Sequence, residues 1–174
     1  MRQKRTLSII ALALCVCMMG FAKAPKYVFY FIGDGMSLNQ VLGTQYFLSQ
    51  EKGKTGIMPL GFTAFPYTGL ATTFSASSDV TDSAAGGTAL ACGEKTANGS
   101  LGLSANQITK VKSIAEMAME QGKRVGIATS VTLNHATPAS FYAHQKSRND
   151  YYEIGVELTQ SGFNFFGGGD FEEN

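Results

Sequence analysis

"RVGIATSVTLNHATPAS", residues 124–140, places a short apolar run directly before a polar loop. The run has the length and composition of a buried strand, and the loop that follows it contains His135 and Thr137. "FNFFGGG", residues 163–169, is a second apolar run of strand length, and a helical pattern over about 150–160 separates the two. Helices that alternate with apolar strands predict an α/β fold with a mainly parallel sheet.

The rest of the chain continues this alternation. "KYVFYFI", residues 26–32, is the most apolar run and predicts a strand buried on both faces, which stops at the "GDG" of residues 33–35. Residues 68–75 predict a weaker strand. Spacing of apolar residues and glycine stops predict helices over residues 38–53, 82–92 and 106–121.

Polar residues follow several of these strands where each strand ends. Asp34 follows the first strand, and His135 and Thr137 follow a later one. Ligands of parallel sheets bind outside the carboxyl ends of the strands, so these side chains are expected to share one edge. Ser83 opens a helix, and a helix N-terminus favours an anion beside it. With no histidine within fifty residues after it, Ser83 as a nucleophile would need activation by a metal.

Each of these residues also has a purely structural interpretation. Asp82 or Ser83 is a good helix N-cap, Asp34 suits a turn, and His135 is ordinary in a loop. Taken singly, the structural interpretation is the better one at each position. Their joint occurrence at one predicted edge is what favours a functional site.

The N-terminus has the three parts of a secretory signal peptide, predicted here as residues 1–22. Basic residues precede an apolar run over 7–22, which is short for a membrane span and ends in small residues. An uncleaved anchor is the alternative. Cleavage would leave residues 23–174 with 11 Lys and Arg against 13 Asp and Glu, which gives no basic surface for nucleic acid. Cys92 would be the only remaining cysteine, which suggests a bacterial, periplasmic protein without its own disulfides.

Four motifs occur in an order that resembles alkaline phosphatases. They are "YFIGDGMS", "TDSAAGGTALACGEKTANGSLGL", "HATPASFYAHQKSR" and "FFGGGDF", and the resemblance that they carry extends from about residue 26 to residue 170. The chain is similar to the N-terminal part of that family. The resemblance implies a three-layer α/β/α fold with a mainly parallel central sheet, of which the N-terminal half is present.

The resemblance also implies roles for individual residues. Ser83 matches the nucleophile that becomes phosphorylated, Arg148 matches the arginine that grips phosphate, and Asp82 matches the acid beside the nucleophile. Asp34 matches the carboxylate that bridges one zinc and the magnesium, and His135 and Thr137 match magnesium-site positions. Gly86 and Gly87 are interpreted as packing residues between helix and sheet, His144 and Cys92 as structural, and Ser37, where many members have glycine, as without function.

The family activity implied is hydrolysis of phosphate monoesters with two zinc ions and one magnesium ion, in a homodimer. Only His135 and His144 are histidines, so most zinc ligands are missing and the chain is expected to be truncated and nearly inactive alone. Two alternatives remain open. One is a sister hydrolase such as a phosphodiesterase or sulfatase. The other is a secreted remnant that binds phosphate or metal without catalysis.

Overall fold

The structure, a computed structural model, describes residues 25–173. The signal peptide predicted for residues 1–22 lies outside this range. The chain divides into two compact units, Met1–Gly33 and Asp34–Asn174. The described residues of the first unit contain no helix or strand, so the strand predicted over residues 26–32 is wrong, and side chains such as Phe29 and Phe31 are 79% and 88% exposed. A central strand needs hydrogen-bonded neighbours on both sides, and apolar character alone does not supply them.

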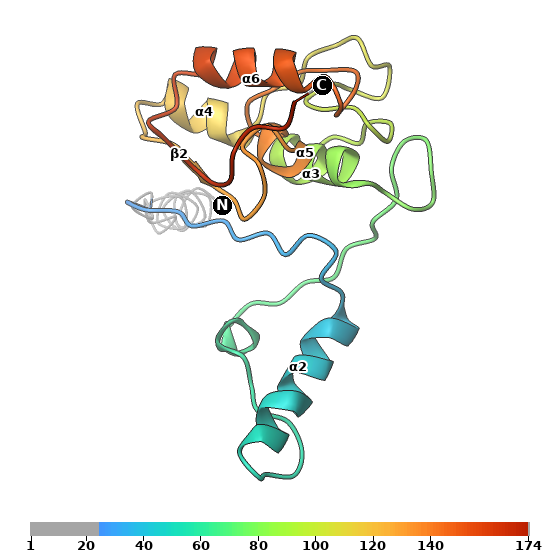
Figure 1. Ribbon diagram of the computed structural model, residues 1–174, viewed down its shortest axis with the longest axis vertical. Coiled ribbons are helices and arrows are strands. Elements are labelled where there is room, and N and C mark those ends of the chain that lie inside the picture. Colours follow the sequence, from blue (N-terminus) through green and yellow to red (C-terminus); the bar gives the residue numbers. More distant parts are fainter. Residues whose placement is uncertain (1–24, 174) are drawn as a thin grey trace, which may run out of the picture. The chain divides into compact units, whose positions relative to one another are not determined.

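The second unit contains all the regular elements of the described residues (Figure 1). In chain order they are α2 (Leu38–Glu51), the 3₁₀ helix η1 (Gly61–Ala64), α3 (Ser83–Cys92), α4 (Ile114–Glu120), β1 (Gly126–Ala128), α5 (Ala136–Ala139), α6 (Tyr151–Gln160) and β2 (Phe165–Gly167). The α/β class is confirmed. No helix in this described range is both long and apolar enough to cross a membrane.

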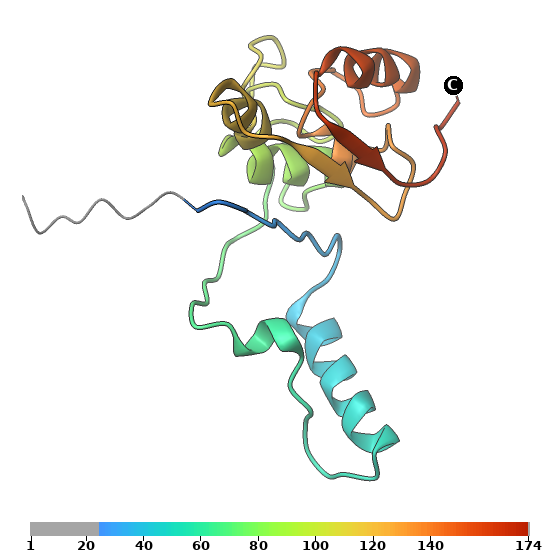
Figure 2. The same cartoon turned by 90° about the vertical axis from the view of Figure 1, so that its left-hand side faces the viewer.

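The sheet in the described residues consists of β1 and β2, which lie side by side in parallel (Figure 2). Ile127 pairs with Phe166 at its centre. The parallel pairing is confirmed, but the burial predicted for the strand that begins the 124–140 stretch is not, because Gly126 and Ala128 of β1 are exposed and Ile127 is only half-buried. The weaker strand predicted over residues 68–75 is absent.

Serine caps determine where two helices begin. Ser37 forms a capping box with Gln40 at the start of α2, which gives this residue a structural role. Ser113 forms the same box with Glu116, so α4 begins at Ile114 rather than near residue 106 as predicted. Residues 103–110 instead form a turn closed by an antiparallel bridge between Leu103 and Lys110. The helical spacing of apolar residues therefore begins several residues before the helix itself does.

The core lies around the contact of α3 with α5, and Ile154 of α6 belongs to the same cluster. Its buried members are Ala84, Leu101, Ala136, Ala139, Tyr142, Ala143 and Ile154. A Cβ on Gly87 would overlap with the Ser140 side chain and lie 3.7 Å from the Thr137 Cα, so glycine permits the close approach of α3 and α5. Gly87 is therefore a packing residue, but against a helix instead of the predicted sheet. A Cβ on Gly86 would make only an ordinary contact with Thr81.

Candidate active site

The N-terminus of α3 brings the predicted acid and nucleophile to one place. Asp82 is the N-cap, with its Oδ1 accepting from the Ala85 amide at 2.9 Å. Ser83 is the first helical residue and is half-buried. An aspartate cap both satisfies a free amide and suits the positive end of the helix. Because the cap fixes the start of α3, it also fixes the backbone from which the Ser83 hydroxyl projects.

Arg148 connects Asp82 to His135. Its Nη1 donates to Asp82 Oδ2 at 3.2 Å, and its Nη2 lies 3.3 Å from His135 Nε2. The arginine and aspartate side chains are about a quarter exposed, at 26% and 24%. Since a guanidinium only donates, Nε2 is the acceptor in this contact, and the neutral imidazole carries its proton on Nδ1. Three of the predicted site residues are thereby joined in one chain of contacts.

Asp34 and Thr137 form the second contact among predicted site residues. The Thr137 hydroxyl donates to Asp34 Oδ2 at 2.9 Å, from α5 to the turn at the beginning of the second unit. His135 lies two residues before Thr137 and is the N-cap of α5. Its Nδ1 is buried and has no hydrogen-bond partner in the structure. Such orphaned polar atoms are uncommon in folded proteins and require an explanation.

Electrostatics keep His135 neutral. Burial lowers the pKa of its imidazole, and the nearby positive charge of Arg148 lowers it further, while Asp34 and Glu172 act in the opposite direction. A neutral imidazole is the form that can accept from Arg148 or bind a metal. The net direction therefore favours a histidine that offers a lone pair, without a charge of its own.

The loop before α5 is held by the glycine run of residues 167–169. Gly169 donates to the Val131 carbonyl at 2.8 Å, and Leu133 donates to the Asp170 carbonyl at 3.1 Å. A Cβ on Gly168 would lie 2.7 Å from Thr129 Cγ2, so a side chain there would separate the two segments. The motif "FFGGGDF" thus positions the loop that leads to His135.

Asn134 is a residue that sequence reasoning missed. It is 1% exposed, its Nδ2 donates to the carbonyls of Tyr151 and Glu172, and its Oδ1 accepts from the Glu172 amide at 2.8 Å. These bonds fasten the residue before His135 to α6 and to the segment after β2. Its position inside the "NHATP" stretch was the available signal, but a buried asparagine with backbone partners cannot be told from a loop asparagine in sequence.

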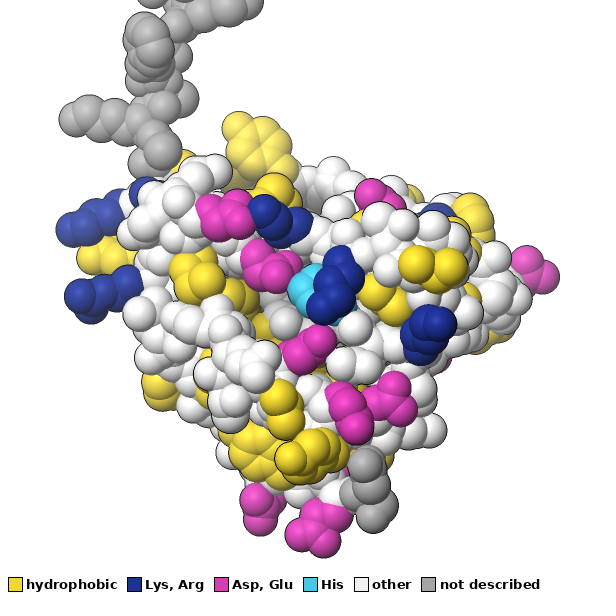
Figure 3. Space-filling view, turned by 90° about the horizontal axis from the view of Figure 1, so that it is seen from above, with side chains coloured by type: hydrophobic (Ala, Val, Ile, Leu, Met, Phe, Trp, Pro, Cys, Tyr) yellow, Lys and Arg dark blue, Asp and Glu magenta, His cyan; other side chains and the backbone are white. Residues whose placement is uncertain are grey.

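Seen from above, one face of the molecule shows a histidine and a basic side chain in contact, with acidic side chains around them (Figure 3). The described residues contain no group of three or more His, Cys, Asp or Glu side chains able to hold a metal ion.

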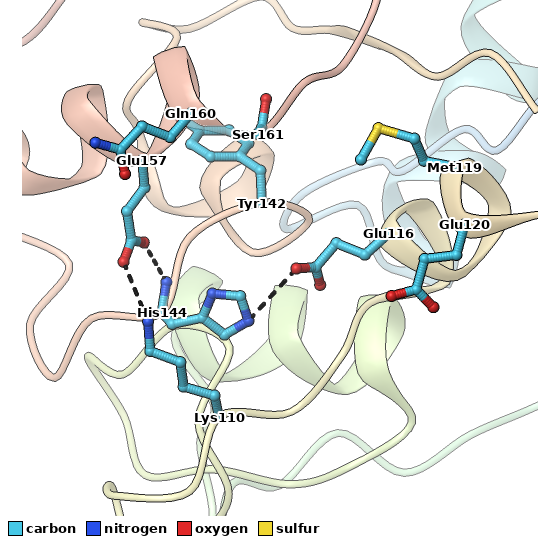
Figure 4. Close-up of a pocket in the computed structure, with 9 residues that line it drawn as sticks. All are labelled: Lys110, Glu116, Met119, Glu120, Tyr142, His144, Glu157, Gln160 and Ser161. Atoms are coloured by element: carbon cyan, nitrogen blue, oxygen red, sulfur yellow. Dashed lines mark hydrogen bonds and ion pairs between the residues drawn. The ribbon is translucent and has the colours of Figure 1, made fainter. Parts of the chain in front are cut away.

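His144 and Cys92, interpreted as structural, lie in a different region. His144 Nε2 is 3.2 Å from the Val111 carbonyl and 3.8 Å from Glu116 Oε1, and the ring points toward Glu116 beside an open cavity of about 260 Å³ (Figure 4). Cys92 is a free thiol whose Sγ lies 3.7 Å from the same Val111 carbonyl. Burial, with Glu116 and Glu94 nearby, raises the pKa of this thiol to about 11.

A family model described as "Alkaline phosphatase" matches residues 25–165. The chain belongs to the alkaline phosphatase family. The match covers both contact groups described above, from Asp34 to Arg148. The suspected resemblance is confirmed, and with it the assignment to a family of phosphatase enzymes.

Known alkaline phosphatases agree in sequence and in structure. A membrane-bound alkaline phosphatase of Bombyx mori is 39% identical over 149 residues, which cover 79% of this chain and 27% of that protein. The structure of alkaline phosphatase from the Antarctic bacterium TAB5 is 41% identical, with a TM-score of 0.68, over 78% of this chain and 37% of that one. A histidine-to-glutamate mutant of the same enzyme, with Mg bound in its M3 site, is 40% identical with a TM-score of 0.68, over 78% and 36% of the two chains.

This alkaline phosphatase chain spans about a quarter of the length of the curated relatives it matches. The structural neighbours support the predicted fold as a partial α/β fold of the alkaline phosphatase type. All six predicted site residues lie in the second unit, and five of them form two contact groups: Arg148 with Asp82 and His135, and Asp34 with Thr137. Ser83 adjoins the first group through the chain.

Proposed function

We propose that this chain supplies the nucleophile and the phosphate grip of a phosphomonoester hydrolase that works through a phosphoserine at Ser83. The observation that supports this most is the bond between Arg148 and Asp82 at the start of α3. It holds a guanidinium beside the residue that precedes a half-buried serine on a helix N-terminus. Both features favour a phosphoryl group at that point.

Ser83 would act in two steps, in which it is first phosphorylated and then released by water. Its Oγ forms a bond to phosphorus while the ester oxygen leaves with the bonding electrons and takes up a proton as the alcohol. Water then forms the second bond to phosphorus, the bond to Oγ breaks, and inorganic phosphate and the free serine are restored. The first turn of α3 supports this chemistry because its amides and dipole favour the negative charge on the transferred group.

Arg148 would bind the nonbridging oxygens of the phosphoryl group. Two of its donors are in use, toward Asp82 and His135, and the planar guanidinium has further N–H donors for a ligand. Its partners fix the plane of the side chain before substrate arrives. Preorganisation of this kind supports transfer reactions, which depend mainly on positioning and charge stabilisation.

A magnesium ion fits the Asp34, Thr137 and His135 group in part. Carboxylate and hydroxyl oxygens are hard ligands that Mg²⁺ prefers, and the orphaned His135 Nδ1–H would gain an acceptor in a water molecule bound to the cation. The Mg bound in the mutant of the Antarctic enzyme supports a cation here. The ion would supply positive charge that lowers the pKa of bound water and offsets charge on the phosphoryl group.

Zinc does not fit the described residues. A catalytic zinc site takes about three protein ligands, and the described residues contain no group of three or more His, Cys, Asp or Glu side chains that could hold a metal ion. We derive no step through zinc. Residues 1–174 alone are therefore expected to show little turnover.

The test is hydrolysis of an aryl phosphate by the protein encoded by the whole gene, at alkaline pH with both metals. Ser83→Ala is expected to abolish turnover, and mass spectrometry of the acid-quenched enzyme is expected to find a phosphoryl group on Ser83. Ser78→Ala is the matched control, because Ser78 is an exposed serine whose hydroxyl accepts from the Val80 amide. Turnover that survives Ser83→Ala would refute the proposal.

Substrate comparison separates the alternatives. Preference for phosphate monoesters over diesters and aryl sulfates supports this proposal, and the reverse supports a sister hydrolase. Binding of phosphate with no turnover by the whole gene product would support a secreted, non-catalytic remnant. Export to a bacterial periplasm and pairing as a homodimer remain predictions, to be checked by fractionation of the native host and by light scattering.

A further inference from the structure

Asn98 ties the loop that leads into α3 to the loop that follows the helix. Its Oδ1 accepts from the Asp82 amide at 3.2 Å, and its Nδ2 donates to the Val80 carbonyl at 2.9 Å. Its own amide donates to Ser77 Oγ at 2.9 Å. One residue therefore bonds to three points of the six-residue segment that ends at the helix cap, residues 77–82.

The next residue completes the hold on the same aspartate. Gly99 donates its amide to Asp82 Oδ2 at 3.0 Å, the oxygen that also accepts from Arg148. Gly99 has a φ of 86°, in the left-handed region that favours glycine, so the sequence "NG" suits this geometry. Asp82 Oδ1 is occupied by the Ala85 amide. Both carboxylate oxygens are thus oriented, and Asn98 anchors the backbone beneath them.

We propose that Asn98 is a positioning residue for Arg148, acting through the backbone and carboxylate of Asp82. This rests on the proposed role of Arg148 in gripping phosphate. Without Asn98, the Asp82 amide and the Val80 carbonyl lose their partner, and the carboxylate is left with a less defined direction. Asn98 itself is exposed, so its removal opens no cavity in the core.

A merely structural role predicts a different result from a positioning role. A structural tie changes the melting temperature and leaves the ligand grip intact in the molecules that remain folded. A positioning residue changes the environment of the Arg148 guanidinium and weakens anion binding with little change in stability. The two cases can therefore be separated by spectroscopy and by ligand titration.

Asn106→Ala is a matched control for Asn98→Ala. Asn106 is also an exposed asparagine that accepts from backbone amides, those of Ile108 and Thr109, but its bonds stay within its own turn. Asn98→Asp separates the two side-chain bonds, because it keeps an acceptor for the Asp82 amide and loses the donor to Val80.

The experiment records the guanidinium NMR signals of Arg148 and titrates inorganic phosphate into the unaltered protein and the three variants. We expect Asn98→Ala to shift the Arg148 signals and to weaken phosphate binding about tenfold, the equivalent of one lost bond to a charged group. Asn98→Asp is expected to fall between it and the unaltered protein, and Asn106→Ala to change neither.

Unchanged Arg148 signals in Asn98→Ala, or an equal shift in Asn106→Ala, would overturn the proposal. So would Asn98→Asp being as harmful as Asn98→Ala, because that result would transfer the role to the Val80 bond. If Asn98→Ala does not fold, hydrogen exchange of backbone amides in the unaltered protein decides. The amides of Asp82 and Gly99 are expected to be protected, because both are hydrogen-bonded. Rapid exchange at either amide would overturn the proposal. The Arg148 signals do not depend on turnover, so a failure of the proposed phosphatase activity would be seen separately, in the Ser83→Ala test.

Discussion

The two histidines of this chain lie in opposite surroundings. His144 is 13% exposed, and its ring is placed between the Val111 carbonyl and Glu116, next to the cavity in Figure 4. His135 has one ring nitrogen against Arg148, and its other nitrogen is buried without a partner. The Nε2 of His144 therefore has partners within the fold, whereas the Nδ1 of His135 has none.

This difference indicates how each region is used. A buried polar atom without a partner lowers stability, so a folded chain retains one mainly where it serves a ligand. The region of His144, with Cys92 on the same Val111 carbonyl, stabilises the packing around α4. The region of His135 is less satisfied and is the region in which Asp34, Thr137 and Arg148 gather. The predictions below test that contrast.

Replacing each histidine by alanine is expected to give the largest difference. His144→Ala should lower the free energy of unfolding by about 2 kcal/mol, because it removes a partner of Val111 and leaves a void among buried groups. His135→Ala should cost less than about 1 kcal/mol, since one of its two ring nitrogens has no bond to lose. Urea denaturation of both variants measures this. Equal losses, or a larger loss for His135→Ala, would break the contrast.

The second largest effect is expected at the contact of α3 with α5. Gly87→Ala forces a methyl group into the Ser140 side chain, next to Thr137, and should destabilise the fold by about 1–3 kcal/mol. Because α5 carries Thr137, the same change should also weaken metal or phosphate binding at the His135 region. Thermal unfolding with and without phosphate measures both.

Gly86→Ala provides the control for this contact, one position away in the same helix. Its methyl group would make only ordinary contacts, at 3.5 Å from Thr81, and alanine is the better helix former by about 1 kcal/mol. It should therefore leave stability unchanged or raise it. Destabilisation by both variants to the same extent would show that α3 tolerates no side chain on this face, independently of Ser140.

The contrast between the two regions could be predicted only partly from sequence. The start of α3 at Ser83, the helix over about 150–160 and the parallel pairing of the two later strands were predictable, because caps, helical spacing and apolar runs are local signals. The six site residues were predicted from the order of four motifs along the chain, and the structure joins five of these residues in two contact groups. Ser83 is joined to them through the chain alone.

The remainder depended on tertiary contacts that local patterns do not encode. The run over residues 26–32 is apolar enough for a strand, yet a strand exists only with hydrogen-bonded neighbours. The helix expected from residue 106 begins at Ile114, because the Ser113 and Glu116 box outweighs the apolar spacing before it. Asn98 and Asn134 were missed because an asparagine reveals its partners only after folding.

The reactivity of the Cys92 thiol is expected to show a smaller effect, and it tests whether burial protects the region around His144. Its thiol pKa is raised to about 11 from an ordinary 9.0, so near pH 10 the folded protein holds mostly thiol while the unfolded chain holds mostly thiolate. Alkylation by iodoacetamide should therefore be about tenfold slower in the folded protein through the thiolate population alone. The same reagent on the urea-unfolded chain is the reference. Equal rates would mean that burial does not protect this region.

The smallest expected effect is the pH dependence of stability that His135 contributes. Burial and the charge of Arg148 lower the pKa of His135 below its ordinary 6.5, so the unfolded chain takes up a proton more readily than the folded one. The contribution to stability is fully present above pH 6.5, and it is lost as the pH falls toward the lowered pKa of the folded state. Acidification should therefore lower the melting temperature more in the unaltered protein than in His135→Gln, measured in chelator-treated buffer.

Arg148→Met separates the two causes of the lowered His135 pKa, because it removes the charge of Arg148 and leaves burial in place. Without the guanidinium charge, the pKa of His135 should move back toward its ordinary value, and the acid loss of stability should become smaller than in the unaltered protein. Parallel pH profiles for the unaltered protein and His135→Gln would mean that this imidazole is not held neutral by the fold. Nε2 would then be protonated as well, and its contact with the Arg148 guanidinium would be lost.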